Sequence, residues 1–132
     1  MKYFTIAELC RSTTADRLGI NNKCNQEHVV NLTALVDNVL DPLRTWYGKP
    51  LTVSSGYRCP ALNKAVGGSA TSQHMTGQAA DIDTGDRQQN KLLFEYISKN
   101  LPFDQLIDES NFAWVHVSYR SDGKNRKQVL KL

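Results

Sequence analysis

Apolar residues recur at helical spacing along one long stretch of the chain, between positions 26 and 47. They stand three or four residues apart, at Val29, Leu32, Val36, Val39, Leu43 and Trp46. This spacing places them on one face and predicts an amphipathic helix. Asn25 can cap the start of this helix, Pro42 should bend or divide it, and Gly48 should end it.

Shorter patterns predict the remaining elements. The capping box Thr5-Ile6-Ala7-Glu8 should open a first helix, and further helices are expected over 60–66 and, after Asp86, over 87–99. The last of these should turn four residues inward: Leu92, Leu93, Tyr96 and Ile97. Strands are expected at 51–55 and 78–83, and at 104–109 and 114–119 on either side of a four-residue loop. The chain should therefore form one α+β domain over residues 1–132, a small antiparallel sheet flanked by helices.

Composition narrows the range of functions. Hydrophobic residues make up 40% of the 132 residues and the net charge is +3, which is ordinary for a globular protein. No cluster of Lys and Arg is dense enough to indicate nucleic-acid binding, and the basic tail after Arg120 is interpreted as a solvated segment. No run of 18 apolar residues predicts membrane insertion. We expect no nucleic-acid partner and a monomer.

The cysteines and the N-terminus bear on the compartment. Cys10, Cys24 and Cys59 are scattered and odd in number, which predicts no disulfide framework and a reducing compartment. None forms a CxxC pair, so zinc held by thiolates is not expected. The first twelve residues lack the apolar run of a signal peptide, which predicts synthesis in the cytoplasm.

The segment SQHMTGQAAD, residues 72–81, contains the most informative polar residues. An unbroken helix would separate His74 and Asp81 by about 10.5 Å along its axis, too far to share a small ligand. Gly77 therefore indicates a bend that lets the two side chains meet, and Ala79 and Ala80 leave space beside them. Asp83, on the same strand face as Asp81, is interpreted as solvated or as a supporting residue. His28, early in its helix, is interpreted as a surface residue.

The predicted hairpin supplies a third candidate. A loop of residues 110–113 would set Ile107 opposite His116 and Glu109 opposite Trp114. Glu109 and His116 would then share a face, with Asp108 on the other, although a register slip of one residue would exchange the two acids. Two imidazoles and one carboxylate are a common catalytic zinc set, and a nearby free carboxylate can act as general base.

These motifs resemble those of the zinc D-Ala-D-Ala carboxypeptidase family. The resemblance rests on SxHxxGxAxD (Ser72 to Asp81), the later WVH, and SSGYRCPALNKAVGG upstream. Relatives include phage L-alanyl-D-glutamate endolysins, vancomycin-resistance D-Ala-D-Ala dipeptidases and the Hedgehog signalling domain. The opening FTIAELCRSTTADRLGI is similar to the small branch associated with phages and prophages, so the resemblance covers nearly the whole chain.

The resemblance implies one zinc ion held by His74, Asp81 and His116, with Arg58 binding substrate and steadying the oxyanion. It also implies pocket-lining roles for Ser55, Tyr57 and Gln73, while Ser72 is interpreted as a turn or supporting residue. Some members carry their catalytic acid three residues before the last histidine, but Ala113 occupies that position here. Hedgehog-like relatives have a glutamate on the preceding strand, which favours Glu109 over Asp108.

The sequence therefore predicts a zinc metallopeptidase acting on the stem peptides of peptidoglycan. Both a D-Ala-D-Ala carboxypeptidase and an L-Ala-D-Glu endopeptidase fit these residues. Release to the cell wall by a phage lysis system would suit a chain made in the cytoplasm. Two alternatives stay open: an inactive zinc-containing module that binds cell wall or protein, and a structural phage component.

Overall fold

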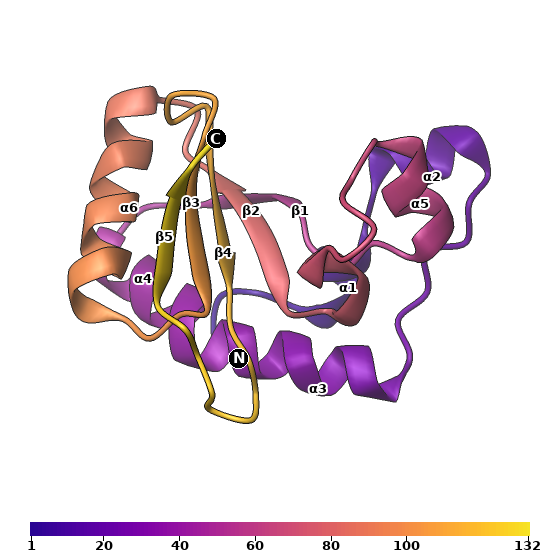
Figure 1. The fold of residues 1–132 in the computed structure, drawn as a ribbon, viewed down its shortest axis with the longest axis horizontal. Helices are drawn as coiled ribbons and strands as arrows, with labels where there is room; N and C mark the ends of the chain where they lie inside the picture. Colours follow the sequence, from indigo (N-terminus) through magenta and orange to yellow (C-terminus); the bar gives the residue numbers. More distant parts are fainter.

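Five strands form one mixed sheet in the order β1-β2-β4-β3-β5, in a computed structural model that describes residues 1–132 (Figure 1). The neighbours β1–β2, β2–β4 and β4–β3 are antiparallel, whereas β5 runs parallel to β3. The strands are β1 Thr52–Ser55, β2 Ala79–Asp83, β3 Gln105–Glu109, β4 Trp114–Ser118 and β5 Gln128–Lys131.

Helices lie behind the sheet and beyond its β1 edge. α4 and α6 lie near the β3 and β5 side in Figure 1, and α1, α2 and α5 gather beyond β1. Their bounds are α1 Ile6–Cys10, α2 Thr13–Leu18, α3 Gln26–Leu35, η1 Val36–Leu40, α4 Asp41–Tyr47, α5 Pro60–Ala65, η2 Gln73–Thr76 and α6 Arg87–Asn100. No helix is long and apolar enough to cross a membrane. The predicted α+β class and the four predicted strands are confirmed.

The long helical stretch runs from Gln26 to Tyr47, as predicted, and contains one wide turn. The π-helical segment η1 lies just before Pro42, which occupies the first turn of α4. Proline lacks an N–H and crowds the carbonyl one turn back, and a wider turn relieves both conflicts. The stripe is fully buried at its centre, from Leu32 to Leu43, while Trp46 is 45% exposed where the helix leaves the core.

The predicted helix starts are also confirmed. Thr5 and Glu8 form a reciprocal capping box at α1, and Asp86 caps α6 through the Gln89 N–H. The prediction of the inward face of α6 is only partly correct, because Leu93 and Ile97 are buried but Leu92 is exposed. Consecutive helical residues point about 100° apart, and of this pair only Leu93 faces the core.

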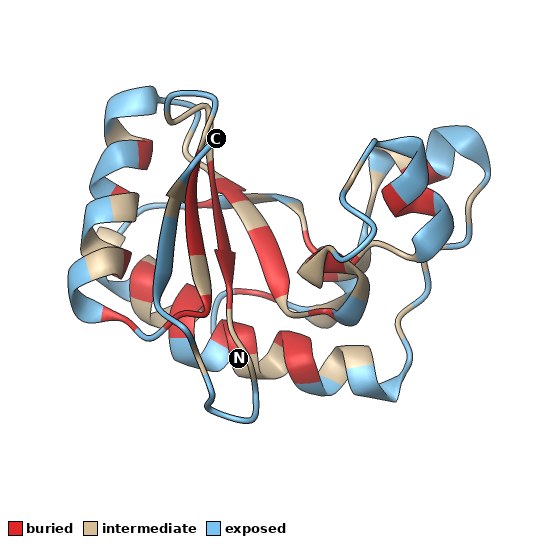
Figure 2. Cartoon of the chain, viewed as in Figure 1, coloured by how far each residue is buried: buried red, intermediate tan, exposed pale blue.

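One face of the sheet is covered by helices. Ala80, Ile82, Leu106, Val115 and Val117 are fully buried there, in one core with side chains from α3, η1, α4 and α6. Figure 2 shows β4 and much of β2 and β3 as buried and β5 as mostly exposed. Side chains alternate along a strand, so the opposite face of β2, β3 and β4 is free to carry polar residues.

The C-terminal tail corrects the predicted sheet. It was interpreted as solvated, but Gln128–Lys131 forms β5, so the sheet is mixed rather than antiparallel. Backbone hydrogen bonds fasten its start: the Lys127 N–H donates to the Phe103 carbonyl and the Gln128 N–H to the Asp104 carbonyl. A short strand that ends in a lysine is typical of a sheet edge, and its four residues, QVLK, are too few to give a clear strand pattern in the sequence.

The cysteines correct a second prediction. Cys10 and Cys24 form a disulfide across a separation of 14 residues, with their Cα atoms 6.5 Å apart, and Cys59 is free. The bond joins the end of α1 to the loop before α3. The intervening helix α2, capped by Ser12, was not predicted, and it is this turn of chain that brings the two cysteines together.

Candidate metal centre

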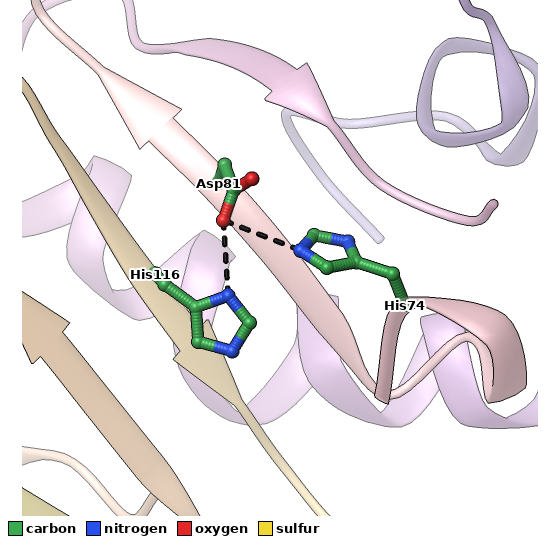
Figure 3. Close-up of side chains that lie close together, drawn as sticks. All are labelled: His74, Asp81 and His116. Carbon is green, nitrogen blue, oxygen red and sulfur yellow. Dashed lines mark hydrogen bonds and ion pairs between the residues drawn. The ribbon is translucent and has the colours of Figure 1, made fainter. Parts of the chain in front are cut away.

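His74, Asp81 and His116 converge on one point from three elements, η2, β2 and β4 (Figure 3). One potential ligand atom of each lies within 4.8 Å of the others. Asp81 Oδ1 is 3.3 Å from His74 Nε2 and 3.0 Å from His116 Nδ1. Asp81 and His116 are direct cross-strand neighbours, so the antiparallel pairing of β2 and β4 sets their proximity.

Gly77 makes the turn that brings His74 to Asp81, as the sequence indicated. It ends η2 with a φ of 77°, a left-handed conformation natural to glycine, and its N–H donates to the His74 carbonyl. A Cβ at this position would lie 2.8 Å from the His28 carbonyl oxygen, closer than such atoms approach. Both the conformation and the space therefore require glycine here.

The His74 ring is held from behind by the backbone. Its Nδ1 lies 2.6 Å from the Gly56 carbonyl oxygen, and only 2% of the residue is exposed. A carbonyl accepts, so Nδ1 carries the proton and, in the neutral ring, Nε2 turns a lone pair toward Asp81. A lone pair facing a carboxylate oxygen calls for a cation or a second proton between them, as at a metal site.

Asp81 keeps its negative charge in this environment. Burial alone would raise the pKa of Asp81, but hydrogen bonds from His116 and His74, and the positive charge that these rings carry when protonated, outweigh it and hold the pKa far below its usual value. The donor set is thus one charged carboxylate oxygen and two imidazole nitrogens, which suits zinc.

The three side chains lie in a cavity of about 750 Å³ on the open face of the sheet. Its floor is a row of cross-strand neighbours: Asp81 pairs with His116, His116 with Ile107, and Ile107 with Leu130. Further lining residues include Arg58, Gln73, Gln105, Glu109, Trp114, Arg126 and Leu132.

The two candidate acids are separated by strand register, which is the register predicted. Ile107 pairs with His116 and Glu109 with Trp114, so Glu109 shares the face of His116 and lines the cavity. Burial, and then the neighbouring charge of Asp81, raises the pKa of Glu109. Asp108 is only 2% exposed and accepts the Phe112 N–H, so its side chain is committed to the turn after β3.

The turn from Ser110 to Ala113 fixes the end of β3 that carries Glu109. Ser110, Asn111 and Phe112 all have positive φ, an uncommon conformation for residues other than glycine. Arg87 donates to the carbonyls of Ser110 and Asn111 at 2.7 Å, and Asn90 donates to that of Phe112 at 2.9 Å. The N-terminal part of α6 therefore stabilises this turn.

Arg58 lines the cavity next to His74. Its backbone N–H donates to the His74 carbonyl and its Nη2 donates to Ser72 Oγ at 3.3 Å. Its Nε is buried and has no hydrogen-bond partner in the protein. Burial lowers the pKa of Arg58, against the opposing charge of Asp81. A half-buried guanidinium with unused N–H groups is suited to bind an anionic group of a ligand.

The remaining predicted residues are divided between two cavities. Gln73 lines the large one, whereas Ser55 and Tyr57 line a smaller one of about 140 Å³ that also borders Arg58. His28 is half-buried rather than a surface residue, because its ring stacks on Tyr57 with centroids 4.1 Å apart. Asp83 supports the chain locally by accepting from the Gly85 N–H and from Asn90.

The C-terminal segment also contributes to the cavity, which the sequence did not predict. Arg126, Leu130 and Leu132 line it, and so does Gln105 at the start of β3. The alternation within QVLKL was the only available signal for a strand, and it carried no motif.

Comparison with known proteins places the chain in a family. Residues 2–118 match the Peptidase M15 family, so this chain belongs to that family. A segment of 39 residues is 46% identical to the zinc D-Ala-D-Ala carboxypeptidase of Streptomyces albus G. That segment covers 30% of this chain and 15% of the Streptomyces protein, so the likeness concerns a small part of the relative.

Proposed function

We propose that this protein is a zinc-dependent peptidase that hydrolyses peptide bonds in the stem peptides of bacterial peptidoglycan. The observation that carries the proposal is the convergence of His74, Asp81 and His116 in an open cavity of a Peptidase M15 chain. The partial likeness to a zinc D-Ala-D-Ala carboxypeptidase supports the substrate class. Both the D-Ala-D-Ala carboxypeptidase type and the L-Ala-D-Glu endopeptidase type are compatible with this site.

The proposed zinc ligands are His74 Nε2, His116 Nδ1 and an Asp81 carboxylate oxygen. A zinc ion held by them would supply Lewis acidity that activates water and polarises a peptide carbonyl. The Gly56 carbonyl keeps His74 in the tautomer that presents Nε2 to the metal. The charge of Asp81 offsets part of the charge of the ion.

Glu109 is the proposed general base. It accepts a proton from the attacking water, whose oxygen bonds to the peptide carbon, and returns a proton to the amine when the C–N bond breaks. The raised pKa of Glu109 brings it closer to working pH, where a carboxylate is a more effective base and then acid. Asp108 is turned into the fold and is not available for this task.

Arg58 is the residue proposed to bind a substrate carboxylate and to stabilise the oxyanion. Its partner-free N–H groups and its fixed charge lie beside His74, where a substrate carbonyl or a terminal carboxylate would be positioned. Hydrogen bonds from a guanidinium strengthen as negative charge develops on the carbonyl oxygen, so they favour the transition state over the substrate. Gln73, Ser55 and Tyr57 are proposed to line the path of the peptide.

The proposal is tested with the zinc-loaded protein and purified muropeptides, with products identified by mass spectrometry. Loss of a terminal alanine indicates the carboxypeptidase, and a stem split after its first alanine indicates the endopeptidase. Glu109→Gln should lower kcat by roughly 10²- to 10⁴-fold and leave zinc content unchanged. Glu95→Gln, an exposed site on α6, is the matched control and should keep full activity.

Two outcomes would contradict parts of the proposal. Cleavage by Glu109→Gln at the original rate would exclude Glu109 as the base. No product from the wild-type protein, with zinc bound and several wall chemistries tried, would exclude the peptidase and favour a non-catalytic binding module.

A further inference from the structure

A second arginine, Arg126, lines the same cavity as Arg58 at the candidate metal centre. Arg58 follows β1 and Arg126 precedes β5, and these strands are the two edges of the sheet. The ligand-bearing strands β2 and β4 lie between them. Arg126 also lies outside residues 2–118, the part of the chain that matches the family.

Asp104 holds Arg126 in place. The guanidinium donates from Nε to Asp104 Oδ1 at 3.0 Å and from Nη2 to Oδ2 at 2.7 Å, a two-pronged contact. Asp104 is fully buried and also accepts from Gln73 Nε2 at 2.9 Å. Its N–H donates to the Ser118 carbonyl, so its backbone is fixed as well. The position of the Arg126 head group is therefore set before any ligand arrives.

Much of the hydrogen-bonding capacity of Arg126 is left over. A guanidinium has five N–H groups, and Asp104 takes two of them. Nη1 has no partner in the protein, and 52% of the side chain is exposed even though it is anchored. A free surface arginine would lose rotamer entropy on binding an anion, and this one has already lost it. That makes Arg126 better suited to ligand binding than an ordinary surface cation.

Hydrogen bonds connect the two arginines along one rim of the cavity. Arg58 contacts Ser72, the next residue Gln73 contacts Asp104, and Asp104 contacts Arg126. Ser72 and Gln73 immediately precede His74, so both guanidinium groups are tied to the segment that carries this proposed ligand. Ile107 and Leu130 line the cavity as an apolar pair on β3 and β5.

We propose that Arg126 forms a second carboxylate-binding subsite, so that the preferred ligand is an acidic peptide with one carboxylate for Arg58 and another for Arg126. Arg126 is then a specificity-determining residue, and aliphatic carbons of the peptide lie along Ile107 and Leu130. The reaction assigned to such a peptide rests on the proposed function. The binding step does not, and it can be measured without turnover.

The test measures peptide binding by calorimetry with zinc-loaded protein that also carries Glu109→Gln, so that the probe is not consumed. The probes are the stem peptide L-Ala-γ-D-Glu-L-Lys-D-Ala and its versions amidated at the glutamate carboxylate, at the C-terminus, or at both. Arg126→Gln should weaken binding of the acidic peptide at least about tenfold. It should weaken binding much less when the carboxylate that contacts Arg126 has been amidated.

Two further variants separate ligand binding from a structural role. Arg120→Gln removes one positive charge outside the cavity and should leave all affinities unchanged. Arg126→Lys keeps an ion pair with Asp104, and so the attachment of β5, but loses the planar fork; it should bind the acidic peptide with intermediate affinity.

Three results would overturn the subsite. In the first, Arg126→Gln weakens the binding of the acidic and the doubly amidated peptide equally. In the second, a folded Arg126→Gln protein binds the acidic peptide with unchanged affinity. In the third, no probe binds to the parent protein. Muropeptide cleavage with an unchanged KM in Arg126→Gln would also overturn it, while leaving the proposed peptidase intact. Loss of cleavage in Glu109→Gln with a normal Arg126 effect on binding would support both proposals.

Discussion

The orientation of His74 depends on a glycine 18 residues before it. Gly56 supplies the carbonyl that fixes the His74 ring, and its own backbone lies against Leu9 of α1 so closely that a Cβ would overlap the Leu9 carbonyl. The next residue, Tyr57, donates its N–H to that same carbonyl at 2.9 Å. The glycine of the SGYR segment is therefore required by packing, and through it α1 helps to set the direction of a proposed zinc ligand.

Asp104 gives a prediction about pH. Hydrogen bonds from Arg126 outweigh burial and lower the pKa of Asp104 to about 2. A lowered folded-state pKa means that this carboxylate stabilises the fold fully above its usual pKa near 4, and that the contribution disappears as pH falls through 2. Asp104→Asn should therefore lower the free energy of unfolding by about 1–3 kcal/mol at pH 7 and by much less at pH 2.

Urea unfolding at pH 7, 4 and 2 measures this difference. Glu95→Gln, which replaces an exposed carboxylate without a hydrogen-bond partner, should show no such trend. If the free energies of unfolding of wild type and Asp104→Asn differ by the same amount down to pH 2, the loss of stability comes from packing rather than from charge.

Individual residues differ in how far the sequence could predict them. The turn at Gly77 and the faces of Glu109 and Asp108 followed from local rules, because a positive φ and a strand period of two are visible in a short segment. Arg126 could not be found in this way. Its place in the cavity depends on a contact with Asp104, 22 residues away, and on the parallel pairing of a strand that carries no motif.

At the scale of elements, the disulfide ties α1 to the start of α3. The loop that it closes contains α2, and the chain beyond it leads directly to the cap of α3 at Asn25. Asn22 within this loop donates to the carbonyls of Cys10 and Tyr57 and accepts from the Cys59 N–H. The loop therefore stabilises the backbone on both sides of Arg58.

Removal of the disulfide should lower the free energy of unfolding by about 3 kcal/mol, because the unfolded chain regains the conformational entropy that a closed loop of this length withholds. The paired substitution Cys10→Ser and Cys24→Ser is compared with the wild type, with and without reductant, in urea. Cys59→Ser is the control and should leave the reductant effect unchanged. If reductant does not alter wild-type unfolding, the bond does not stabilise the fold in solution.

The long helix and the sheet show where element prediction succeeds and fails. Capping residues and the apolar stripe from Leu32 to Leu43 predicted the helix because both signals are local. The strand β5 and the disulfide were missed because each depends on a partner distant in the sequence, Asp104 for one and the end of α1 for the other. Tertiary pairing, which composition cannot reveal, decided both.

At the scale of the whole molecule, metal binding should contribute to stability. The three proposed ligands come from η2, β2 and β4, so a metal ion would link segments that are separate in the unfolded chain. Zinc at a concentration roughly 1,000 times its Kd should add about 4 kcal/mol to the free energy of unfolding. This corresponds to a rise in Tm on the order of 10 °C over protein whose metal has been removed by a chelator.

Differential scanning calorimetry with chelator, with zinc and with magnesium tests this expectation. Magnesium prefers six oxygen ligands and should give no comparable shift. Asp81→Asn keeps the side-chain shape but removes the charged ligand, and should abolish most of the zinc effect. An equal zinc effect in wild type and Asp81→Asn would place the metal elsewhere.

The order of strands places the proposed metal ligands at the centre of the sheet and the proposed substrate-binding arginines at its edges. Asp81 and His116 are on β2 and β4, which have neighbours on both sides, whereas the two arginines adjoin the edge strands β1 and β5. An edge strand has one neighbour, so its sequence can drift, lengthen or be exchanged while the interior pairing persists. For evolution or for an engineer, the sheet margins are thus the natural place to retarget this scaffold toward a different peptide while retaining its chemistry.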